Sequence, residues 1–330
     1  MIKVQAAEFV DINASADFMG PGTLETNKYQ TEIVDMVKRR LPLGQKIAQV
    51  PATGHPSRYF EQIAIPTAGF TDPRQLTQTP SIPKRVERVV YLKAISGQIN
   101  FSFFDTEVTR QQGDFAYLEA KDLNDLLAGS LKVHDLALWQ GNDTSMFTPT
   151  TVQYYGISGQ IFNAIAIGDP TVPHLVNVGT TDSLVDKFKT QIAAMINRTD
   201  FEVSPSGIYL NSLLGDKFDQ EAKATNVQMN EIEVIPGVIV KALATQAGPV
   251  PLVQDPGITV FGGGAGGTSY YTAFITMENM IEYHYLTTPL PRVFQLGLQG
   301  NLAGQFVVVK FGAVAVKGAG YAHAIMVVNK

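Results

Sequence analysis

The sequence predicts an α+β protein in which long extended segments accompany a few amphipathic helices. Three observations lead to this prediction. Two strand-like runs flank a Pro-rich tip within residues 51–95, a stripe of leucines at helical spacing covers residues 118–139, and helices alternate with strands from about residue 170. Such a mixture of helices and separately grouped strands is typical of α+β folds.

The composition indicates a protein that assembles with other protein. Charged residues make up 17% of the 330-residue chain and apolar residues 45%. Ordinary soluble proteins contain about 25% charged residues. Because a monomer needs charge to keep its surface hydrated, the low charged fraction suggests that much of the surface faces other subunits. The net charge of −5 argues against a duplex-DNA-binding protein, which usually carries a basic face.

Several protein classes are excluded or disfavoured by what the sequence lacks. There is no cysteine, which excludes disulfides, thiolate catalysis and zinc–thiolate sites. Residues 1–18 contain no basic region followed by an apolar core, so we expect no signal peptide. A membrane-spanning helix needs about 18 or more apolar residues in a row, and the sequence has no such run. We therefore expect a protein that is made in the cytoplasm and has no membrane segment.

The N-terminal part is predicted to be irregular and then helical. Residues 1–28 show no regular pattern, whereas residues 29–40 place Ile33, Met36 and Val37 on one helical face. Pro42 is expected to end this helix, because proline cannot continue a helix from its interior.

Residues 51–95 predict a long two-stranded arm. Two extended runs, residues 58–66 and 85–95, lie on either side of a polar, Pro-rich tip. An isolated hairpin is at best marginally stable in water, so the arm needs another surface to lie against. Its basic residues lack the interleaved aromatic residues of a nucleic-acid platform. We expect these residues to contact an acidic part of a neighbouring subunit: Arg58, Arg74, Lys84, Arg85 and Arg88.

The remaining elements follow from hydrophobic periodicity and capping signals. The clearest helix is predicted at residues 118–139, with Gly141 placed to end it. A second amphipathic helix is predicted at residues 183–196, where Ser183 and Asp186 have capping-box spacing. We further expect a strand at 201–205, a short helix at 206–215, and strands at 237–243, 251–255 and 269–277.

The C-terminal tail, residues 305–329, is nearly uncharged. Only Lys310 and Lys317 interrupt its apolar surface, which predicts burial in a core or between subunits. Residues 317–320, with the sequence Lys-Gly-Ala-Gly, are expected to turn one strand back onto the next.

A glycine run at residues 262–267 matches a nucleotide-binding fingerprint by its letters. Gly262, Gly264 and Gly267 fit the pattern G-x-G-x-x-G. The fingerprint requires a helix after its third glycine, because the helix N-terminus holds the pyrophosphate, but residues 268–276 favour a strand. We therefore interpret the run as a flexible loop and retain a nucleotide-binding enzyme as the less favoured alternative. The glycines of this loop are Gly262, Gly263, Gly264, Gly266 and Gly267.

No catalytic, cofactor or metal site emerges from the other residues. Glu278, Glu282 and His284 form an acidic cluster with one histidine. Glu282 and His284 would share one face of a strand, as a pair of metal ligands might, but no third ligand for that pair is in sight. His134 lies on the apolar stripe of the predicted helix at 118–139, which predicts a hydrogen-bonded core histidine. The serine-nucleophile motif G-x-S-x-G is absent. The sequence therefore predicts no enzyme activity and no cofactor.

The order of these elements resembles that of the major capsid proteins of tailed bacteriophages, which have the Hong Kong 97-type fold. Residues 136–157, LALWQGNDTSMFTPTTVQYYGI, resemble the end of the family's spine helix, its Gly-Asn/Asp turn and its aromatic-Gly-aliphatic stretch. Residues 199–218 resemble the strand, Ser-Pro-Ser-type turn and helix of the family's axial domain, and residues 236–255 resemble the strand and bend that follow. The similarity extends from about residue 28 to residue 330.

The resemblance implies a division of the chain into domains. The glycine run would then lie in a turn of the axial domain, where subunits of a ring approach one another. The expected parts are an N-terminal arm (1–50), an extended loop (51–95), a peripheral domain with the spine helix (96–170), an axial domain (171–285) and a C-terminal β segment of the peripheral domain (286–330).

The resemblance also implies a structural function. The expected protein assembles with itself through pentamers and hexamers into an icosahedral phage head, located in the virion, that encloses double-stranded DNA without sequence-specific contact. Separate scaffolding and portal proteins are implied, and a decoration or cement protein is a further candidate partner. Two family features have no counterpart in this sequence. Only about 28 residues precede the first predicted helix, where some members have a long scaffolding segment, so we expect either a separate scaffolding protein or a mature, trimmed form of the chain. No motif for a Lys–Asn cross-link matches in the arm. An encapsulin-like compartment shell is the alternative within this fold.

Overall fold

The computed structural model describes residues 41–72, 74, 80–102, 104, 107, 111, 118–140, 152–164, 174–224, 229–235, 238–262, 269–299 and 303–329. All of them belong to one structural unit, residues 37–330. The predicted helix at 29–40 and the glycines from Gly263 to Gly267 lie outside the described residues.

A five-stranded sheet forms one half of this unit. The long strand β14 lies at its centre and pairs with β4 along residues 303–312, with β13 on its other side, and with β12 near its end. The strand order is β1-β12-β14-β13, and β4 pairs with β14. The strands are β1 (Ala48–Pro51), β4 (Lys93–Ser102), β12 (Ile281–Tyr285), β13 (Arg292–Gln299) and β14 (Ala303–Val316).

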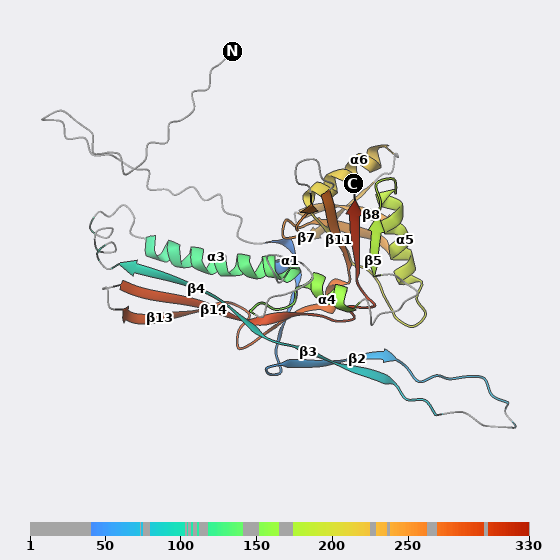
Figure 1. Cartoon of the computed structure of the whole chain (residues 1–330), viewed down its shortest axis with the longest axis horizontal. Helices are drawn as coiled ribbons and strands as arrows, with labels where there is room; N and C mark the ends of the chain where they lie inside the picture. The colour runs from blue at the N-terminus through green and yellow to red at the C-terminus, as the bar shows by residue number, and fades with distance from the viewer. Residues whose placement is uncertain are drawn as a thin grey trace, which may run out of the picture. The chain divides into compact units, whose positions relative to one another are not determined.

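Helix α3 (Leu118–Trp139) packs against β4 and β14, along which it runs in Figure 1. The predicted helix at 118–139 is therefore confirmed. Its leucine stripe faces the sheet, and Leu126 approaches Gly97 of β4 so closely that a Cβ at that position would lie 2.8 Å from the leucine side chain. His134 is buried, and its Nδ1 lies 3.2 Å from the Tyr154 hydroxyl, as expected for a hydrogen-bonded core histidine.

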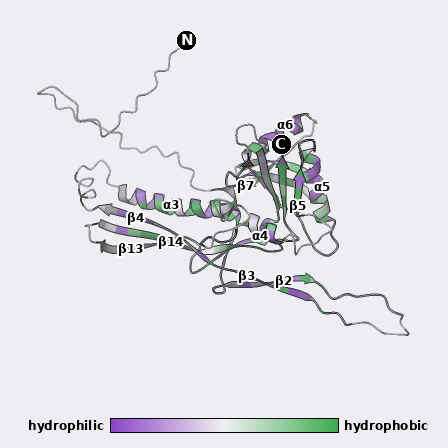
Figure 2. Ribbon diagram, in the orientation of Figure 1, coloured by the Kyte–Doolittle hydropathy of each residue, from purple (hydrophilic) through white to green (hydrophobic). Residues whose placement is uncertain are grey.

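An eight-stranded mixed sheet forms the other half. Helices α5 (Leu184–Ile196) and α6 (Ser212–Ala224) pack against it and against each other, with Phe188 and Phe218 in edge-to-face contact. In Figure 2 both helices show hydrophilic as well as hydrophobic residues, as expected for amphipathic helices. The strand order is β5-β15-β11-β6-β9-β8-β7, and β10 pairs with β11. The strands are β5 (Leu175–Val178), β6 (Gly207–Leu210), β7 (Asn230–Ile235), β8 (Val238–Thr245), β9 (Gly248–Gln254), β10 (Phe261–Gly262), β11 (Ser269–Thr276) and β15 (Ala324–Asn329).

Local signals predicted one helix start correctly and missed another. The Ser183 hydroxyl accepts a hydrogen bond from the Asp186 amide, so the predicted cap of α5 is confirmed. Whether Pro42 ends the predicted helix at 29–40 stays a prediction, because those residues lie outside the described ranges. Pro42 begins the short helix α1 (Pro42–Lys46), which was not predicted. The reason is that proline fits the first helical position, where its missing N–H would have no helical partner, and Leu41 before it is extended.

The predicted strand at 201–205 is wrong, and the predicted helix at 206–215 is correct only for its last residues, 212–215. Residues 207–210 instead form β6, whose four residues are buried between β9 and β11. Helix α6 starts only after Asn211, whose side-chain oxygen accepts a hydrogen bond from the Leu213 amide. Tertiary pairing to two neighbouring strands overrides the helical pattern of this stretch. The predicted strands at 237–243, 251–255 and 269–277 are present as β8, β9 and β11.

The C-terminal tail is buried as predicted, but it does not form a hairpin. β14 belongs to the five-stranded sheet, whereas β15 pairs with β11 and β5 of the eight-stranded sheet. Residues 317–323, named the crossover turn from here on, therefore carry the chain from one sheet into the other. Lys310 is buried, with its ammonium 4.6 Å from the centre of the Tyr283 ring. The domain boundaries proposed from the resemblance remain a prediction.

A buried carboxylate connects the end of α3 to the loop after β9. Asp255 is completely buried, and its Oδ2 accepts hydrogen bonds from Trp139 Nε1 at 3.0 Å and from the Leu43 amide at 3.4 Å. Its Oδ1 accepts from the Gly257 amide at 2.8 Å. The Trp139 ring stacks on Phe274 of β11, with ring centres 4.7 Å apart. Asp255 thus joins α1, α3 and the eight-stranded sheet at one point.

We predict that Asp255→Asn lowers the free energy of unfolding by about 2–4 kcal/mol. An amide can accept only through its single oxygen, so its NH₂ group would face the buried N–H donors of Trp139 and Leu43 without a partner. Urea unfolding followed by Trp139 fluorescence, the signal of the only tryptophan, measures the change. Asp200→Asn, at an exposed position, is the control and should change stability little; equal losses in both variants would contradict the role of Asp255.

Candidate assembly site at the hairpin

The predicted arm exists as a separate two-stranded sheet. β2 (Ser57–Ala64) and β3 (Lys84–Val90) pair antiparallel, from Ser57 opposite Val90 to Ala64 opposite Lys84. This hairpin shares no strand pairing with either large sheet. In Figure 1 the described part of the hairpin beyond β2 and β3 extends away from both of them. The prediction of a two-stranded arm is confirmed, but its second predicted run, residues 85–95, is divided between β3 and the start of β4 in the five-stranded sheet.

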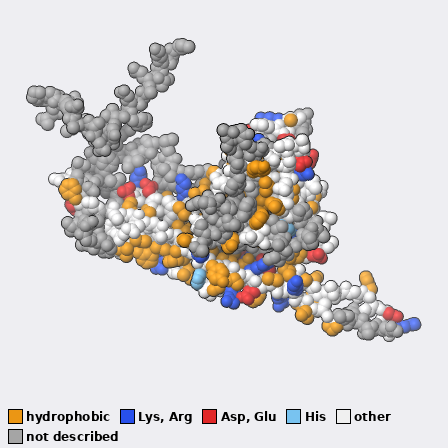
Figure 3. All heavy atoms as spheres, in the orientation of Figure 1, with side chains coloured by type: hydrophobic (Ala, Val, Ile, Leu, Met, Phe, Trp, Pro, Cys, Tyr) orange, Lys and Arg blue, Asp and Glu red, His pale blue; other side chains and the backbone are white. Residues whose placement is uncertain are grey.

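The two faces of the hairpin differ in exposure. Alternate residues of β2 point to opposite sides, so Ser57, Tyr59 and Glu61 share a half-buried inner face and the residues between them an exposed outer face. Phe60 on the outer face is 71% exposed. Hydrophobic atoms recur along the hairpin in Figure 3. The large exposed apolar residues of the hairpin and its root are Phe60, Ile65, Phe70, Ile82, Val89 and Tyr91. Such a series is typical of surfaces that contact other protein.

The five predicted basic residues lie on different parts of the hairpin. On the outer face, Arg58 forms an ion pair with Glu87 at 3.0 Å. On the inner face, Arg88 pairs with Glu61 at 2.7 Å. Arg85 donates to Gln62, while Lys84 and Arg74 are exposed. The sequence did not predict this pairing within the hairpin, and the contact of the five residues with a neighbouring subunit stays a prediction. Residues 57–90 hold five basic and three acidic residues, a net charge of +2 in a chain of net charge −5.

The inner face of β2 contacts the body of the protein at three successive positions. The Ser57 hydroxyl lies 2.9 Å from His284 Nδ1 of β12. The Tyr59 hydroxyl donates to the Val316 carbonyl, the last residue of β14, at 3.4 Å. Glu61 Oε1 accepts from the Gly318 amide of the crossover turn at 2.8 Å. Burial, with a smaller effect of the Glu61 charge, raises the pKa of Tyr59 well above its ordinary value, so the phenol stays a neutral donor.

Ser57, His284 and Glu282 have the order of a serine–histidine–carboxylate relay, but their surroundings do not suit catalysis. His284 Nε2 lies 3.2 Å from Glu282 Oε2, and Glu282 Oε1 accepts from Lys317 Nζ at 2.6 Å. Ser57 is only 1% exposed and does not line the neighbouring cavity, so its hydroxyl cannot reach a substrate. The array instead fastens the root of the hairpin to β12 and to the crossover turn.

The predicted acidic cluster with one histidine does not form a metal site. Glu278 is engaged elsewhere, accepting from Lys46 at 3.2 Å and from the Tyr209 hydroxyl at 2.5 Å. In the part of the chain that the structure describes, no group of three histidine or carboxylate side chains could hold a metal ion.

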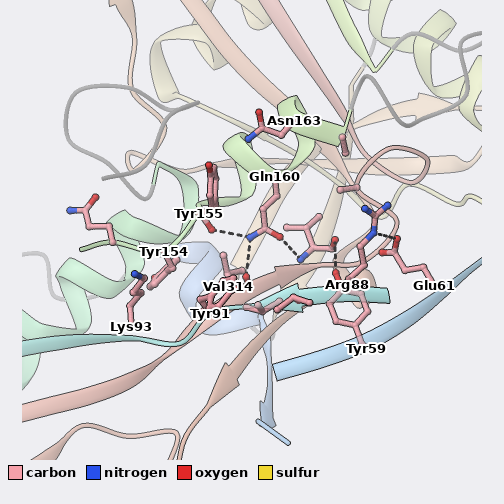
Figure 4. A pocket seen from close by; sticks show the side chains of 17 residues that line it. Tyr59, Glu61, Arg88, Tyr91, Lys93, Tyr154, Tyr155, Gln160, Asn163 and Val314 are labelled. Atoms are coloured by element: carbon pink, nitrogen blue, oxygen red, sulfur yellow. Dashed lines mark hydrogen bonds and ion pairs between the residues drawn. The ribbon is translucent and has the colours of Figure 1, made fainter. Parts of the chain in front are cut away.

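A cavity of about 710 Å³ lies beside the root of the hairpin. Tyr59, Glu61 and Arg88 of the hairpin line it on one side, and Gln160 and Asn163 of α4 (Ile157–Ala164) line it on another (Figure 4). The Gln160 amide closes the edge of β14 beyond its pairing with β4. Its Nε2 donates to the Val314 carbonyl at 2.9 Å, and its Oε1 accepts from the Val316 amide at 3.0 Å.

The crossover turn is fixed from the side of the eight-stranded sheet by two buried histidines. His323 Nε2 lies 3.1 Å from the Lys317 carbonyl, and its Nδ1 lies 3.4 Å from the Met277 amide. His174 Nδ1 donates to the His323 carbonyl at 2.7 Å, while Arg198 contacts His174 Nε2 and the Tyr321 carbonyl, each at 2.9 Å. Burial lowers the pKa of His323 to about 4, so this imidazole is neutral, with Nε2–H as donor and Nδ1 as acceptor.

The glycine run is bounded by strands on both sides. Phe261 and Gly262 form β10, which pairs with Tyr270 and Ser269 of β11. A strand therefore follows the run, as predicted, where the nucleotide fingerprint would need a helix. The flexibility proposed for Gly262, Gly263, Gly264, Gly266 and Gly267 stays a prediction.

Sequence analysis missed the residues that hold the hairpin. Glu61 and Gln160 were not singled out, and residues 317–320 were predicted only as a turn, although Ser57, Tyr59 and Glu61 share the two-residue spacing of one strand face. That spacing indicates a common face but does not indicate what the face contacts.

Comparison with known proteins identifies the fold. A chain from Gordonia phage Cozz matches with a TM-score of 0.58 and 14% identity, covering 100% of this chain and 98% of that chain. The capsid of a native GTA particle matches with a TM-score of 0.56 and 12% identity over 99% of both chains. The holo-SrpI encapsulin complex from Synechococcus elongatus matches with a TM-score of 0.56 and 10% identity, covering 92% of this chain and 91% of that chain. No family model matches the sequence, and no curated protein matches it significantly.

These matches show that the chain has the α+β fold of Hong Kong 97-type capsid proteins, as the resemblance predicted. The similarity spans nearly the whole length of this chain and of its structural neighbours. None of the helices in the described ranges is long and apolar enough to cross a membrane.

We predict that acid destabilises the fold through His323. Its pKa is lowered from 6.5 to about 4 in the folded state, so the unfolded chain binds more protons in this window and stability falls as the pH drops from about 6.5 towards 4. The full loss from this residue is about 3 kcal/mol. Unfolding in urea at pH 7.5 and at pH 4.5 measures it. The pH dependence should shrink in His323→Gln and persist in the control His55→Gln, an exposed position; an unchanged dependence in His323→Gln would contradict the prediction.

Proposed function

We propose that this chain is the major capsid protein of a tailed bacteriophage and that self-assembly is its activity. The single observation that carries the proposal is the hairpin: a two-stranded sheet without its own core, lined by exposed apolar residues, on a chain with a capsid fold. A hairpin of this kind gains stability when another subunit covers it. The proposal includes no enzyme activity and no cofactor.

The proposed assembly proceeds through pentamers and hexamers to an icosahedral head. A hairpin that contacts a neighbour at a different surface makes a head-to-tail interface, and such interfaces close into rings. Each contact can be individually weak, because many contacts made together hold a closed shell. In this scheme, residues 171–285 surround the ring centres and the hairpins connect neighbouring subunits. The loop with Gly262 to Gly267 adjusts to different ring environments.

The basic residues of the hairpin are proposed to contact acidic surface on a neighbouring copy. The hairpin is positive while the chain as a whole is negative, so two copies attract each other when one hairpin lies on the other's body. Arg58 and Arg88 already hold ion pairs within the hairpin, whereas Lys84 and Arg74 project outward. Lys84 and Arg74 are therefore the better placed for contact between subunits.

The proposed surroundings are those of a phage head. The net negative charge suits a container that encloses double-stranded DNA without sequence-specific contact, because a basic lining would add strong, salt-dependent attraction. Separate scaffolding and portal proteins, and a decoration or cement protein, complete the proposed set of partners. The subunit would be made and assembled in the host cytoplasm and end in the virion.

An encapsulin-like compartment shell is the second candidate, favoured by the structural match to an encapsulin. The two candidates differ in what is inside the shell. A cargo protein that copurifies with the shells would favour the compartment, whereas packaged DNA and a portal would favour the phage head.

We predict that deleting residues 71–81, the tip of the hairpin, leaves folded subunits that do not close into shells. None of the described residues of this segment belongs to either hydrophobic core, so its loss should leave the far-ultraviolet circular dichroism and the urea midpoint nearly unchanged. Negative-stain microscopy and sedimentation velocity measure assembly. Normal shells from the deleted protein would remove the hairpin from the proposed mechanism.

We also predict that Lys84→Glu weakens assembly in a salt-dependent way. Reversing an exposed hairpin charge turns attraction to an acidic neighbour into repulsion, so the protein concentration needed for assembly should rise several-fold at about 0.05 M salt and converge on wild type near 1 M. Light scattering against protein concentration measures this. Lys223→Glu, an equally exposed position on α6, is the matched control. Identical behaviour of the two variants would contradict a specific role for the hairpin charge.

A further inference from the structure

The hairpin is joined to the body through a short root. Residues 52–56 connect β1 to β2, and residues 91–92 connect β3 to β4. Leu92 is buried in the core below α3, whereas Tyr91 beside it is exposed. Short connections between elements are the segments that absorb hinge rotations. The root therefore fixes where the hairpin starts but leaves its direction to contacts farther along β2.

The inner-face contacts of β2 resist rotation to different degrees. Ser57 lies at the root, and Glu61 lies four residues farther along the strand, about 13 Å away at 3.3 Å per residue. Of the three contacts at Ser57, Tyr59 and Glu61, the one at Glu61 lies farthest from the root. It therefore restricts rotation of the hairpin about the root most strongly. The Tyr59 hydroxyl, at 3.4 Å from the Val316 carbonyl, is also a longer hydrogen bond than the 2.8 Å contact between Glu61 and Gly318.

Glu61 uses both carboxylate oxygens at this position. Oε1 accepts from the Gly318 amide at 2.8 Å, and Oε2 accepts from Arg88 Nε of the partner strand at 2.7 Å. Both are charge-assisted hydrogen bonds, which are stronger than neutral ones. The carboxylate thus connects both strands of the hairpin to a single point of the crossover turn.

The crossover turn, which supplies the Gly318 amide to Glu61, is itself held in place by several hydrogen bonds. Gly318 has a φ of +63°, a conformation that suits glycine and orients its N–H. Lys317 on one side is bonded to Glu282 and, through its amide, to the Met280 carbonyl. From the side of the eight-stranded sheet, the Met277 amide, which follows β11, donates to His323 Nδ1, and Arg198 donates to the Tyr321 carbonyl. A hairpin fastened to Gly318 is therefore fastened to both sheets.

The cavity beside the root gives the hairpin room to move. Glu61 and Arg88 lie on one side of this 710 Å³ space, and Gln160 and Asn163 of α4 lie across it (Figure 4). Rotation of the hairpin towards α4 would thus enter open space, which costs less than displacing a packed core.

We infer that Glu61 is the positioning residue that sets the direction of the hairpin, through its bridge between Arg88 and Gly318 of the crossover turn. When the bond from Glu61 to Gly318 opens, the hairpin rotates about its root while both sheets stay folded. The consequence for shells rests on the proposed function, because the direction of the hairpin decides which surface of a neighbouring copy it reaches. The positioning role itself is a property of the isolated subunit.

Spin labels test this role directly. The chain has no cysteine, so Ala68→Cys near the hairpin tip and Thr190→Cys on α5, both exposed, provide two unique labelling sites. Pulsed electron paramagnetic resonance on the full chain, diluted with unlabelled protein, gives the distribution of distances between the two labels. Glu61→Ala is compared with Glu87→Ala, which removes the ion pair to Arg58 on the outer face of the same hairpin.

We expect a narrow distribution in wild type and in Glu87→Ala, and one at least twofold broader in Glu61→Ala. Hydrogen exchange at the Gly318 amide should accelerate at least tenfold in Glu61→Ala only. A broad distribution in wild type, or equal widths in the two variants, would overturn the inference. If Glu61→Ala fails to fold, Glu61→Gln is measured in its place with the same criteria. Because the subunits are measured unassembled, absence of shells would count against the proposed function but not against this result.

Discussion

The crossover turn at residues 317–323 is the constraint on which the arrangement of the described chain depends. It takes the backbone out of β14, which organises the five-stranded sheet, and into β15, which pairs within the eight-stranded sheet. Its position is set by hydrogen bonds from both directions: His323 and Arg198 act from one sheet, and Glu282 and Glu61 from the other sheet and the hairpin. Asp255 provides a second connection at the end of α3. The hairpin thus starts from a body whose two halves cannot shift independently near its root.

Local sequence signals predicted the elements whose structure is decided locally. The leucine period of α3 and the capping pair at the start of α5 need no partner from far away, and both predictions are confirmed. β6 and the tail show the opposite case. Residues 207–210 become a strand because β9 and β11 lie on either side, and the Lys-Gly-Ala-Gly turn at 317–320 does not encode which sheet receives the next strand. In both cases the structure is decided by pairing between strands that are far apart in the sequence. A short stretch of sequence carries no information about such pairing.

At the candidate site, too, features of the arm itself could be predicted from its sequence, whereas contacts between residues far apart in the chain could not. Two extended runs on either side of a Pro-rich tip predicted an arm, and its basic residues were identified from the sequence of that arm alone. The contact between Glu61 and Gly318 joins residues 257 positions apart, so no reading of the arm by itself could reveal it. The ion pairs that engage Arg58 and Arg88 within the hairpin likewise depend on strand register. The sequence therefore indicated the arm and its basic residues. The fold determines which of these residues pair within the hairpin and which are left for contact with other subunits.

The central claim is that the chain is built to be covered by copies of itself, and its assembly state tests that claim most directly. Negative-stain electron microscopy of the purified full chain, at high concentration and with or without a scaffolding protein, is the decisive measurement. The account predicts shells, rings or capsomers built from many copies. A monodisperse monomer under all of these conditions would contradict it.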